Sequence, residues 1–500
     1  MSPPRKPRAR STAPDPDRWP ECTRCGQCYQ LAARWPEGPI CTYCYNAARR
    51  REGVCADCGH TGMVPGLNTA GEPACLRCSG VPLMLTCAGC GQEAWLAKGA
   101  TCWRCLLRDM VHDHLAGPDG QISPALQPMA EALCSMPRAN SGVTWMRANP
   151  QVGQLLRGLG TGSIELSHEA LDALPAGRTV EYLRALLVTH HALPPRDRRL
   201  ATFQRWLDDT LARVDHPEHK QLLDRFARWH HLRDLRRQSE HGPVEAGPVL
   251  RAKQSITVTI EFLGWLDRRG ITLAELSQHE IDSWHAGGPG TREHVQRFLY
   301  WCRAQRLTGK LELPRRDKDN PRLIGEHARL EIIRSLLLHD ELALPYRIAG
   351  CLITLFGQPA GKVVALTLAD LAESDASSPE LRLRLGKQWV PVPEQLAALI
   401  RLHLEHRANT NTAANAQSRW LFPGQVPGEH LSRTTLLAAL RGAGIPVRAA
   451  RNTTWQQLVR EAPPQVLADA LGISPATAMK HAQRAGSDWA RYVSTTLHQR

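Results

Sequence analysis

The chain has 500 residues, of which 42% are hydrophobic and 5% aromatic, and its formal net charge at pH 7 is +14. This length allows about three or four domains of ordinary size, and the apolar content is sufficient for buried cores. The positive charge favours an anionic partner, nucleic acid before a membrane surface, although Lys and Arg are spread along the chain and could simply keep it soluble. No run approaches the ~18 apolar residues of a membrane helix, so we expect no membrane partner.

Residues 1–20 are basic and have no apolar stretch after their charges. This composition is not that of a secretory signal, and it predicts a disordered tail that could contact phosphates. We therefore expect a cytoplasmic, nucleoid-associated protein in which cysteines serve as metal ligands rather than in disulfides.

Residues 21–108 contain three repeats of a four-cysteine unit, which begin at Cys22, Cys55 and Cys87 and are thus 33 and 32 residues apart. Each unit has two Cys-x-x-Cys pairs, and the first pair always ends in Cys-Gly, where the glycine lets backbone amides turn toward the thiolates. The predicted metal ligands are Cys22, Cys25, Cys41 and Cys44, then Cys55, Cys58, Cys75 and Cys78, then Cys87, Cys90, Cys102 and Cys105.

Four thiolates from two such pairs suit structural zinc, and a closed shell of four ligands leaves no position for catalysis. Iron–sulfur and redox sites use the same pairs, but neither predicts a threefold tandem. Each unit has too few apolar residues to fold alone, so three Zn²⁺ ions would supply folding energy, on the order of 10 kcal/mol per site. Cys28 is left over. Zinc ribbons bind nucleic acid or protein, and the array could dock either partner.

The middle of the chain divides into two parts. Residues 109–175, rich in Gly, Pro, Ser and Asn, predict a linker with short helices. Residues 176–315 show helical periodicity throughout, with a predicted helix start near Ser277 and a break at residues 287–290. One helix carries a basic face that could lie on a DNA backbone or be a solvated surface, formed by Arg225, Arg228, Arg233, Arg236 and Arg237.

Residues 316–500 form the last predicted domain. An apolar helix ends at Phe356, a Gly-Gln-Pro turn follows, and a second helix runs to near Asp370. Residues 381–393 alternate as in a short hairpin that carries Lys387.

Near the end of the chain, residues 466–481 read as a helix-turn-helix in which Gly472 makes the turn and Ser474 caps the second helix. The second helix would present four side chains to a DNA groove or phosphate, namely Thr477, Lys480, His481 and Arg484. The same pattern is also compatible with a simple packing pair of helices.

The order of these features resembles the tyrosine recombinase (phage integrase) family over about residues 180–492. The segment 256–313 is similar to its helical core-binding (SAM-like) domain, and residues 356–371 are similar to the heart of its catalytic domain. We therefore expect a mostly α protein with an N-terminal zinc-ribbon array, a helical core-binding domain and an α+β recombinase-like C-terminal domain.

The resemblance also assigns the catalytic positions. The family's first catalytic Arg falls on Pro359 and the following Glu on Lys362. The motif His-x-Leu-Arg-His is matched by residues 448–452, so that Arg451 keeps the second Arg, while Arg448 and Asn452 replace the two His. Ala482 stands where the nucleophilic Tyr belongs, ten residues before Tyr492.

The family's chemistry uses two guanidinium groups on the scissile phosphate and a Tyr nucleophile, and a unit that lacks this many members should be nearly inert. We therefore expect a double-stranded DNA-binding protein without strand cleavage, with Arg448 and Arg451 among its DNA contacts. Two alternatives stay open: an active recombinase with a rearranged site built from Arg451, Lys387 and Tyr492, and a protein-docking scaffold that uses the zinc ribbons. By analogy with the family, the chain could form a dimer or a higher assembly on DNA.

Overall fold

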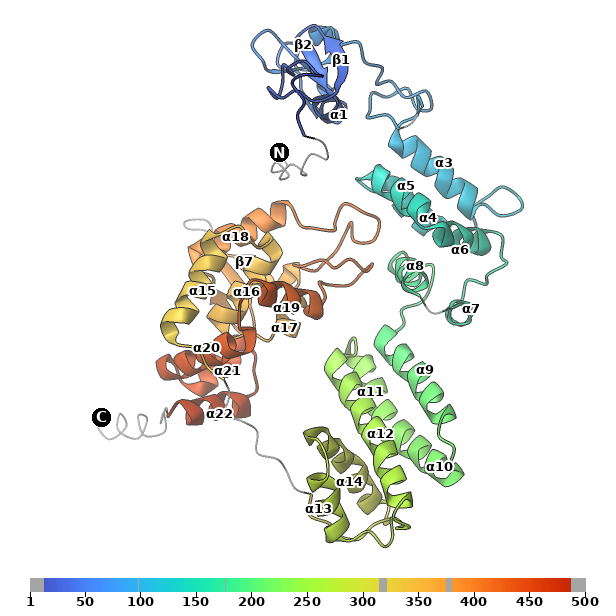
Figure 1. Cartoon of the computed structure of the whole chain (residues 1–500), viewed down its shortest axis with the longest axis vertical. Coiled ribbons are helices and arrows are strands. Elements are labelled where there is room, and N and C mark those ends of the chain that lie inside the picture. The colour runs from blue at the N-terminus through green and yellow to red at the C-terminus, as the bar shows by residue number, and fades with distance from the viewer. Residues whose placement is uncertain (1–12, 98, 176, 314–321, 375–379, 487–500) are drawn as a thin grey trace. The chain divides into compact units, whose positions relative to one another are not determined.

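The computed structural model describes residues 13–97, 99–175, 177–313, 322–374 and 380–486 (Figure 1). The chain divides into two compact units, one formed by residues 1–193 and 322–500 and the other by residues 194–321. Helices predominate and the sheets are small, as the fold class predicted. None of the helices in the described ranges has the length and apolarity that crossing a membrane requires.

The first two N-terminal cysteine units are built on short antiparallel hairpins. The first unit has β1 (Leu31–Trp35) paired with β2 (Gly38–Cys41), followed by α1 (Thr42–Ala48). The second contains β4 (Thr61–Met63), which pairs with β3 (Glu52–Val54). It also has a second hairpin and a short helix, namely β5 (Gly66–Leu67), β6 (Pro73–Ala74) and α2 (Leu76–Ser79). The third unit is held by isolated bridges, Thr86 to Glu93 and Leu96 to Cys102.

The last cysteine unit continues directly into a helical module. Its central helix is α3 (Trp103–Leu115), and the helices that follow are α4 (Gln127–Ser135), α5 (Ala139–Ala148), α6 (Pro150–Gly160), α7 (His168–Asp172) and α8 (Arg178–Thr189). Leu107, Val111 and Leu115 of α3 lie at the centre of an apolar core shared by these helices. The segment for which the sequence predicts a linker thus contributes most of a packed core.

In its described part, the unit of residues 194–321 contains helices and loops but no strand. It contains α9 (Arg198–Ala212), α10 (Pro217–Phe226), a π-helical turn η1 (Ala227–Leu232), α11 (Arg233–His241), α12 (Ala246–Asp267), α13 (Gln278–Ala286), a 3-10 turn η2 (Gly290–Val295) and α14 (Gln296–Ala304). Phe226, Phe262 and Phe298 are fully buried at its centre. Ser277 and Glu280 form a capping box at the start of α13, where the sequence predicts a helix start.

The C-terminal region packs around one buried helix, α16 (Leu344–Phe356), whose middle is apolar on all sides. Its neighbours are α15 (Glu326–Leu338), α17 (Ala360–Val364), the 3-10 turn η3 (Leu368–Asp370), α18 (Glu394–Glu405), α19 (Arg433–Gly442) and α20 (Val447–Glu461). A sheet of three antiparallel strands completes it, with the order β7 (Leu371–Glu373), β8 (Leu381–Arg384) and β9 (Trp389–Pro391). The pair β8–β9 is the predicted hairpin.

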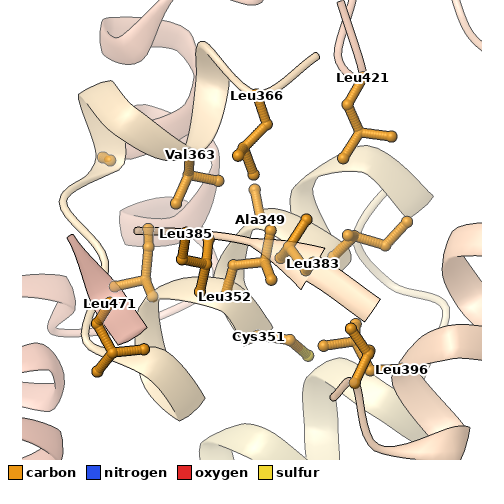
Figure 2. Packing of buried hydrophobic residues seen from close by; sticks show 14 of the residues in the cluster. Ala349, Cys351, Leu352, Val363, Leu366, Leu383, Leu385, Leu396, Leu421 and Leu471 are labelled. Carbon is orange, nitrogen blue, oxygen red and sulfur yellow. The ribbon is translucent and has the colours of Figure 1, made fainter. Parts of the chain in front are cut away.

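Figure 2 shows how this core joins distant segments of the chain. Ala349 and Leu352 of α16 lie near Leu383 of β8, Val363 of α17 and Leu471, which ends α21 (Pro464–Leu471). The turn after α16 and the final helices are therefore parts of one packed body. The last described helix is α22 (Pro475–Ala485).

Candidate metal centres and nucleic-acid interface

The structure gathers the twelve predicted ligands into three clusters of four. Within each cluster all four sulfur atoms lie within 4.8 Å of one another. The Sγ–Sγ distance is 3.8 Å for Cys25 and Cys41, 3.8 Å for Cys58 and Cys75, and 4.0 Å for Cys90 and Cys102. Thiolates held ~2.3 Å from a tetrahedral metal would be about 3.8 Å apart, whereas a disulfide requires about 2.05 Å. All twelve cysteines are free, so the clusters fit a metal ion and are not disulfides.

Backbone amides point at these sulfurs, as the Cys-Gly pattern predicts. Gly26, Gly59 and Gly91 all adopt left-handed backbone conformations, with φ of 63°, 71° and 70°. The amide of Cys75 donates to Sγ of Cys55 at 3.3 Å and lowers the pKa of that thiol to about 6. The amide of Cys102 donates to Sγ of Cys87 at 3.2 Å and likewise lowers the pKa of that thiol to about 6. One thiol in each of these two clusters is therefore held close to its thiolate form, which metal ions require. The pKa of another is raised to about 12, that of Cys78 by its sulfur neighbours and that of Cys105 by burial, so a bound cation would have to offset the repulsion among four thiolates.

Neighbouring cysteine units contact one another. Trp35 and Ile40 of the first unit share an apolar cluster with Val81 at the end of the second. The guanidinium of Arg50 lies 4.2 Å from the ring centroid of Trp95 in the third unit. Cys28 is half-buried and belongs to none of the three clusters.

The turn after α16 carries Pro359, the position that the sequence resemblance equates with a first catalytic Arg. Gly357 ends the helix with φ of 61°, and Pro359 stands at the N-cap of α17. The carbonyl oxygen of Gly357 accepts hydrogen bonds from Nε of Arg451 at 2.7 Å and from Nε1 of Trp455 at 2.8 Å. Arg451 is half-buried, and burial lowers its pKa. This guanidinium is therefore part of the packing of the turn.

Lys362, which the sequence resemblance equates with a Glu, is also bound to backbone. Its Nζ donates to the carbonyl oxygen of Leu385, to that of Leu471 at 3.0 Å and to that of Gly472 at 3.2 Å. Burial lowers the pKa of this amine, and the negative end of α21 favours its positive form. The ammonium thus ties the end of β8 to the turn after α21.

Lys387 lies on the exposed tip of the β8–β9 hairpin, where 82% of its side chain is accessible. Its Nζ is 2.9 Å from Oδ1 of Asp469 on α21. Among the described residues it makes no contact with Arg451, so the structure does not bring these two predicted catalytic residues together. The third, Tyr492, lies outside the described residues.

The helices α21 and α22 have the predicted helix-turn-helix form. Gly472 has φ of 63° at the end of α21, and Ser474 caps α22 by accepting from the amide of Thr477 at 3.2 Å. On α22 the side chains of Thr477, Lys480 and Arg484 are exposed. These positions follow one helical stripe, so they present a hydroxyl and two cations on one face.

His481 differs from the other three because its ring packs inward. It stacks on Trp455, with a centroid distance of 5.3 Å and an interplanar angle of 19°. Burial and the charges of Arg451, Arg484 and Lys480 lower its pKa to about 4, so the ring is neutral at pH 7. Arg448, at the start of α20, is exposed. His481 thus packs α22 against Trp455 of α20, and it is not part of the exposed face formed by Thr477, Lys480 and Arg484.

Two residues that matter here were not singled out by the sequence analysis. Trp455 is fully buried and donates to Gly357, and Gln358 is fully buried with its Nε2 3.1 Å from the carbonyl oxygen of Leu471. A polar residue between an apolar helix and a proline is the signal that could have identified Gln358. Trp455 lies on a helix with no clear apolar stripe, and only its contacts reveal its role.

No family model matches this sequence, and no curated protein matches it. The structure comparison finds site-specific recombinases. XerH recombinase bound to palindromic difH substrate is 12% identical, with 61% of this chain and 97% of that chain covered and a TM-score of 0.37. The Tn1549 transposon integrase in complex with circular intermediate DNA is 13% identical, with coverages of 52% and 94% and a TM-score of 0.36. Lambda integrase, as a tetramer bound to a Holliday junction, is 14% identical, with coverages of 56% and 88% and a TM-score of 0.33.

Proposed function

We propose that this chain is a double-stranded DNA-binding protein that holds three structural zinc ions and does not cleave DNA strands. The observation that carries the proposal is the surface of α22, where Thr477, Lys480 and Arg484 follow one exposed stripe behind a capped helix start. A helix that follows a tight turn and presents cations suits a major groove or its phosphates. The net charge of +14 supports the same class of partner.

The proposal that cleavage is absent rests on the state of the catalytic positions. Phosphoryl transfer by this family's chemistry needs two guanidinium groups at the phosphate and a nucleophile beside them. Pro359 and Lys362 supply neither guanidinium nor carboxylate, and Nε of Arg451 is already bound to Gly357. Ala482 is buried where a tyrosine would be needed. A DNA-binding role requires none of the missing groups.

Zinc is the metal that the cysteine clusters suit best. Four soft sulfur ligands in a closed tetrahedral arrangement favour it over harder cations, which prefer oxygen. Held there, the ion would be structural, because the four cysteines of each cluster fill its coordination shell. The ribbons could then dock DNA or a protein partner.

The experiment that tests DNA binding uses the zinc-loaded full chain, which is incubated with fragmented genomic DNA at near-physiological salt before the retained fragments are sequenced. Sharp shared sites support a specific DNA-binding protein, and uniform retention indicates binding to the backbone alone. Absence of retention would refute the proposal. Retained fragments then serve to test for a covalent protein–DNA adduct, whose appearance would show that cleavage persists.

The role of α22 is tested with the double variant Lys480→Gln/Arg484→Gln. If both side chains contact phosphates, the slope of log affinity against log salt concentration should fall by about 2. The matched control, Arg334→Gln/Arg441→Gln, removes two exposed charges from α15 and α19. Equal losses in both variants would mean that net charge, rather than the α22 surface, drives binding.

A further inference from the structure

The unit of residues 194–321 contains a pocket where three helices meet the π-helical turn η1. Its volume is about 190 Å³, and its polar lining comes from His231 of η1, Asp234 and Gln238 of α11, Arg251 of α12 and Arg297 of α14. Single π-helical turns inside α-helices are frequent at functional sites because they re-aim a side chain. Here the turn places His231 between the core and the pocket.

His231 is the buried polar side chain of this pocket, and one of its ring nitrogens has no hydrogen bond within the described residues. Its side chain is 4% exposed, and its Nε2 is buried without a hydrogen bond in the described part of the chain. The ring packs edge-on against Phe226 at 4.9 Å. A buried ring nitrogen of this kind is costly to leave unsatisfied, so a ligand that accepts or donates a hydrogen bond would be favoured here.

The charges around the pocket select an anion. Arg251 and Arg297 are exposed, and within the described ranges neither forms an ion pair. The one carboxylate of the lining, that of Asp234, is paired with Arg237 at 3.1 Å. Burial, His230 and Arg297 together lower the pKa of His231 to about 3. An anion would offset the unfavourable cationic field and accept hydrogen bonds from both guanidinium groups.

We infer that His231, Arg251 and Arg297 form a binding site for a single phosphate group. The volume is below the roughly 300–1,000 Å³ of pockets that enclose drug-sized ligands, so a phosphate fits and a whole nucleotide does not. The neutral His231 ring donates from Nε2, and the two guanidinium groups bind the remaining oxygens. The phosphate belongs either to a DNA backbone or to a free phosphate ester, since both offer the same phosphate oxygens to these three side chains.

The test measures binding of inorganic phosphate to the zinc-loaded full chain by calorimetry, with chloride at equal ionic strength as the salt control. Ring signals of ¹³C-labelled histidine report on His231, which is assigned through His231→Gln. We expect saturable binding that shifts the His231 signal. Arg251→Gln and Arg297→Gln should each weaken it about tenfold or more, since each removes a charge-assisted hydrogen bond. The control is Arg236→Gln, an exposed arginine of α11 outside the pocket lining.

Duplex DNA is then added to the phosphate-bound protein. Displacement of phosphate together with a shift of His231 assigns the site to a backbone phosphate, and retention of phosphate assigns it to a free ester. Lack of a saturable His231 shift up to about 10 mM phosphate, or an equal loss in Arg236→Gln, would overturn the inference. The phosphate arm contains no DNA, so its failure is distinct from a failure of the proposed DNA binding.

Discussion

Gly472 forms the turn between α21 and α22, and we predict that Gly472→Ala unfolds this pair locally. Its φ of 63° lies in the left-handed region. A Cβ built there would lie 2.4 Å from the carbonyl oxygen of Leu385, 2.4 Å from Nζ of Lys362 and 2.9 Å from Cα of Gly386. Two of these three atoms are backbone of the β8–β9 hairpin, so they cannot move aside as the end of a flexible side chain would.

The magnitude follows from two separate costs. An L-residue in the left-handed conformation costs roughly 1–2 kcal/mol, and overpacking against fixed atoms costs about 1–3 kcal/mol more. The sum is about 2–5 kcal/mol. Gly444→Ala is the matched control, because Gly444 has a similar φ of 75° with no atom within 4 Å of its Cβ position. Gly444→Ala should therefore lose stability only through the left-handed conformation, by roughly 1–2 kcal/mol.

Hydrogen exchange measures both effects locally, which is necessary because a chain of several modules has no single unfolding free energy. Since about 1.4 kcal/mol corresponds to a factor of ten, protection of α21, α22 and the hairpin should fall about 30- to 5,000-fold in Gly472→Ala. Protection around Gly444 should fall about 5- to 30-fold in its own variant. If the two losses are equal, the contact between the hairpin and the turn contributes nothing, and our account of the turn is wrong.

Three further predictions follow from single contacts. Ser474→Ala should lower the stability of α22 by about 1 kcal/mol in hydrogen exchange, whereas Ser474→Asp, which keeps the cap, should not. Cys105→Ser should reduce bound metal from three ions to two and expose α3 to proteolysis, because Cys105 lies in the first turn of that helix. The control Cys58→Ser should also lose one ion but leave α3 protected from proteolysis. His481, with a pKa lowered to about 4, binds protons less readily when folded than unfolded. Stability of the C-terminal helices should therefore fall as pH drops from about 6.5 to 4, and less so in His481→Gln.

The metal clusters and the helix-turn-helix could be predicted from sequence because their signals are local. A Cys-x-x-Cys-Gly unit specifies its own turn, and Gly472 followed by Ser474 specifies the end of one helix and the start of the next. The helices between residues 109 and 175 gave a misleading signal. Gly142, Gly153 and Gly160 look like loop residues, yet each allows close approach to α3, as the 2.6 Å from a Cβ at Gly160 to the Leu115 oxygen shows.

Helix α17, which follows the Gly-Gln-Pro turn, is shorter than the spacing of its apolar residues predicts. It ends at Val364, and the backbone then pairs with a distant segment: the amide of Leu421 donates to Leu366 and that of Leu368 donates to Arg419, both at 2.8 Å. Thr367 and Asp370 form a capping box on the 3-10 turn between these pairings. Apolar residues in such a segment are buried by partners 51 and 55 residues away in the sequence, and the spacing of apolar residues alone cannot distinguish such a segment from a helix.

Long-range contacts also give structural roles to the residues that the sequence resemblance equates with catalytic positions. A Glu at position 362 would be repelled by the carbonyl oxygens of Leu385, Leu471 and Gly472, whereas the ammonium of Lys362 binds all three. Lys387, by contrast, makes an exposed ion pair with Asp469, which contributes little to stability. Lys362 and Arg451 thus fix the turns that hold α22 in place, and α22 is the surface that we propose binds DNA. A Pro359→Arg variant would therefore supply one guanidinium without the carboxylate, the imidazoles and the tyrosine that recombinase chemistry uses, so we expect it to remain without cleavage activity.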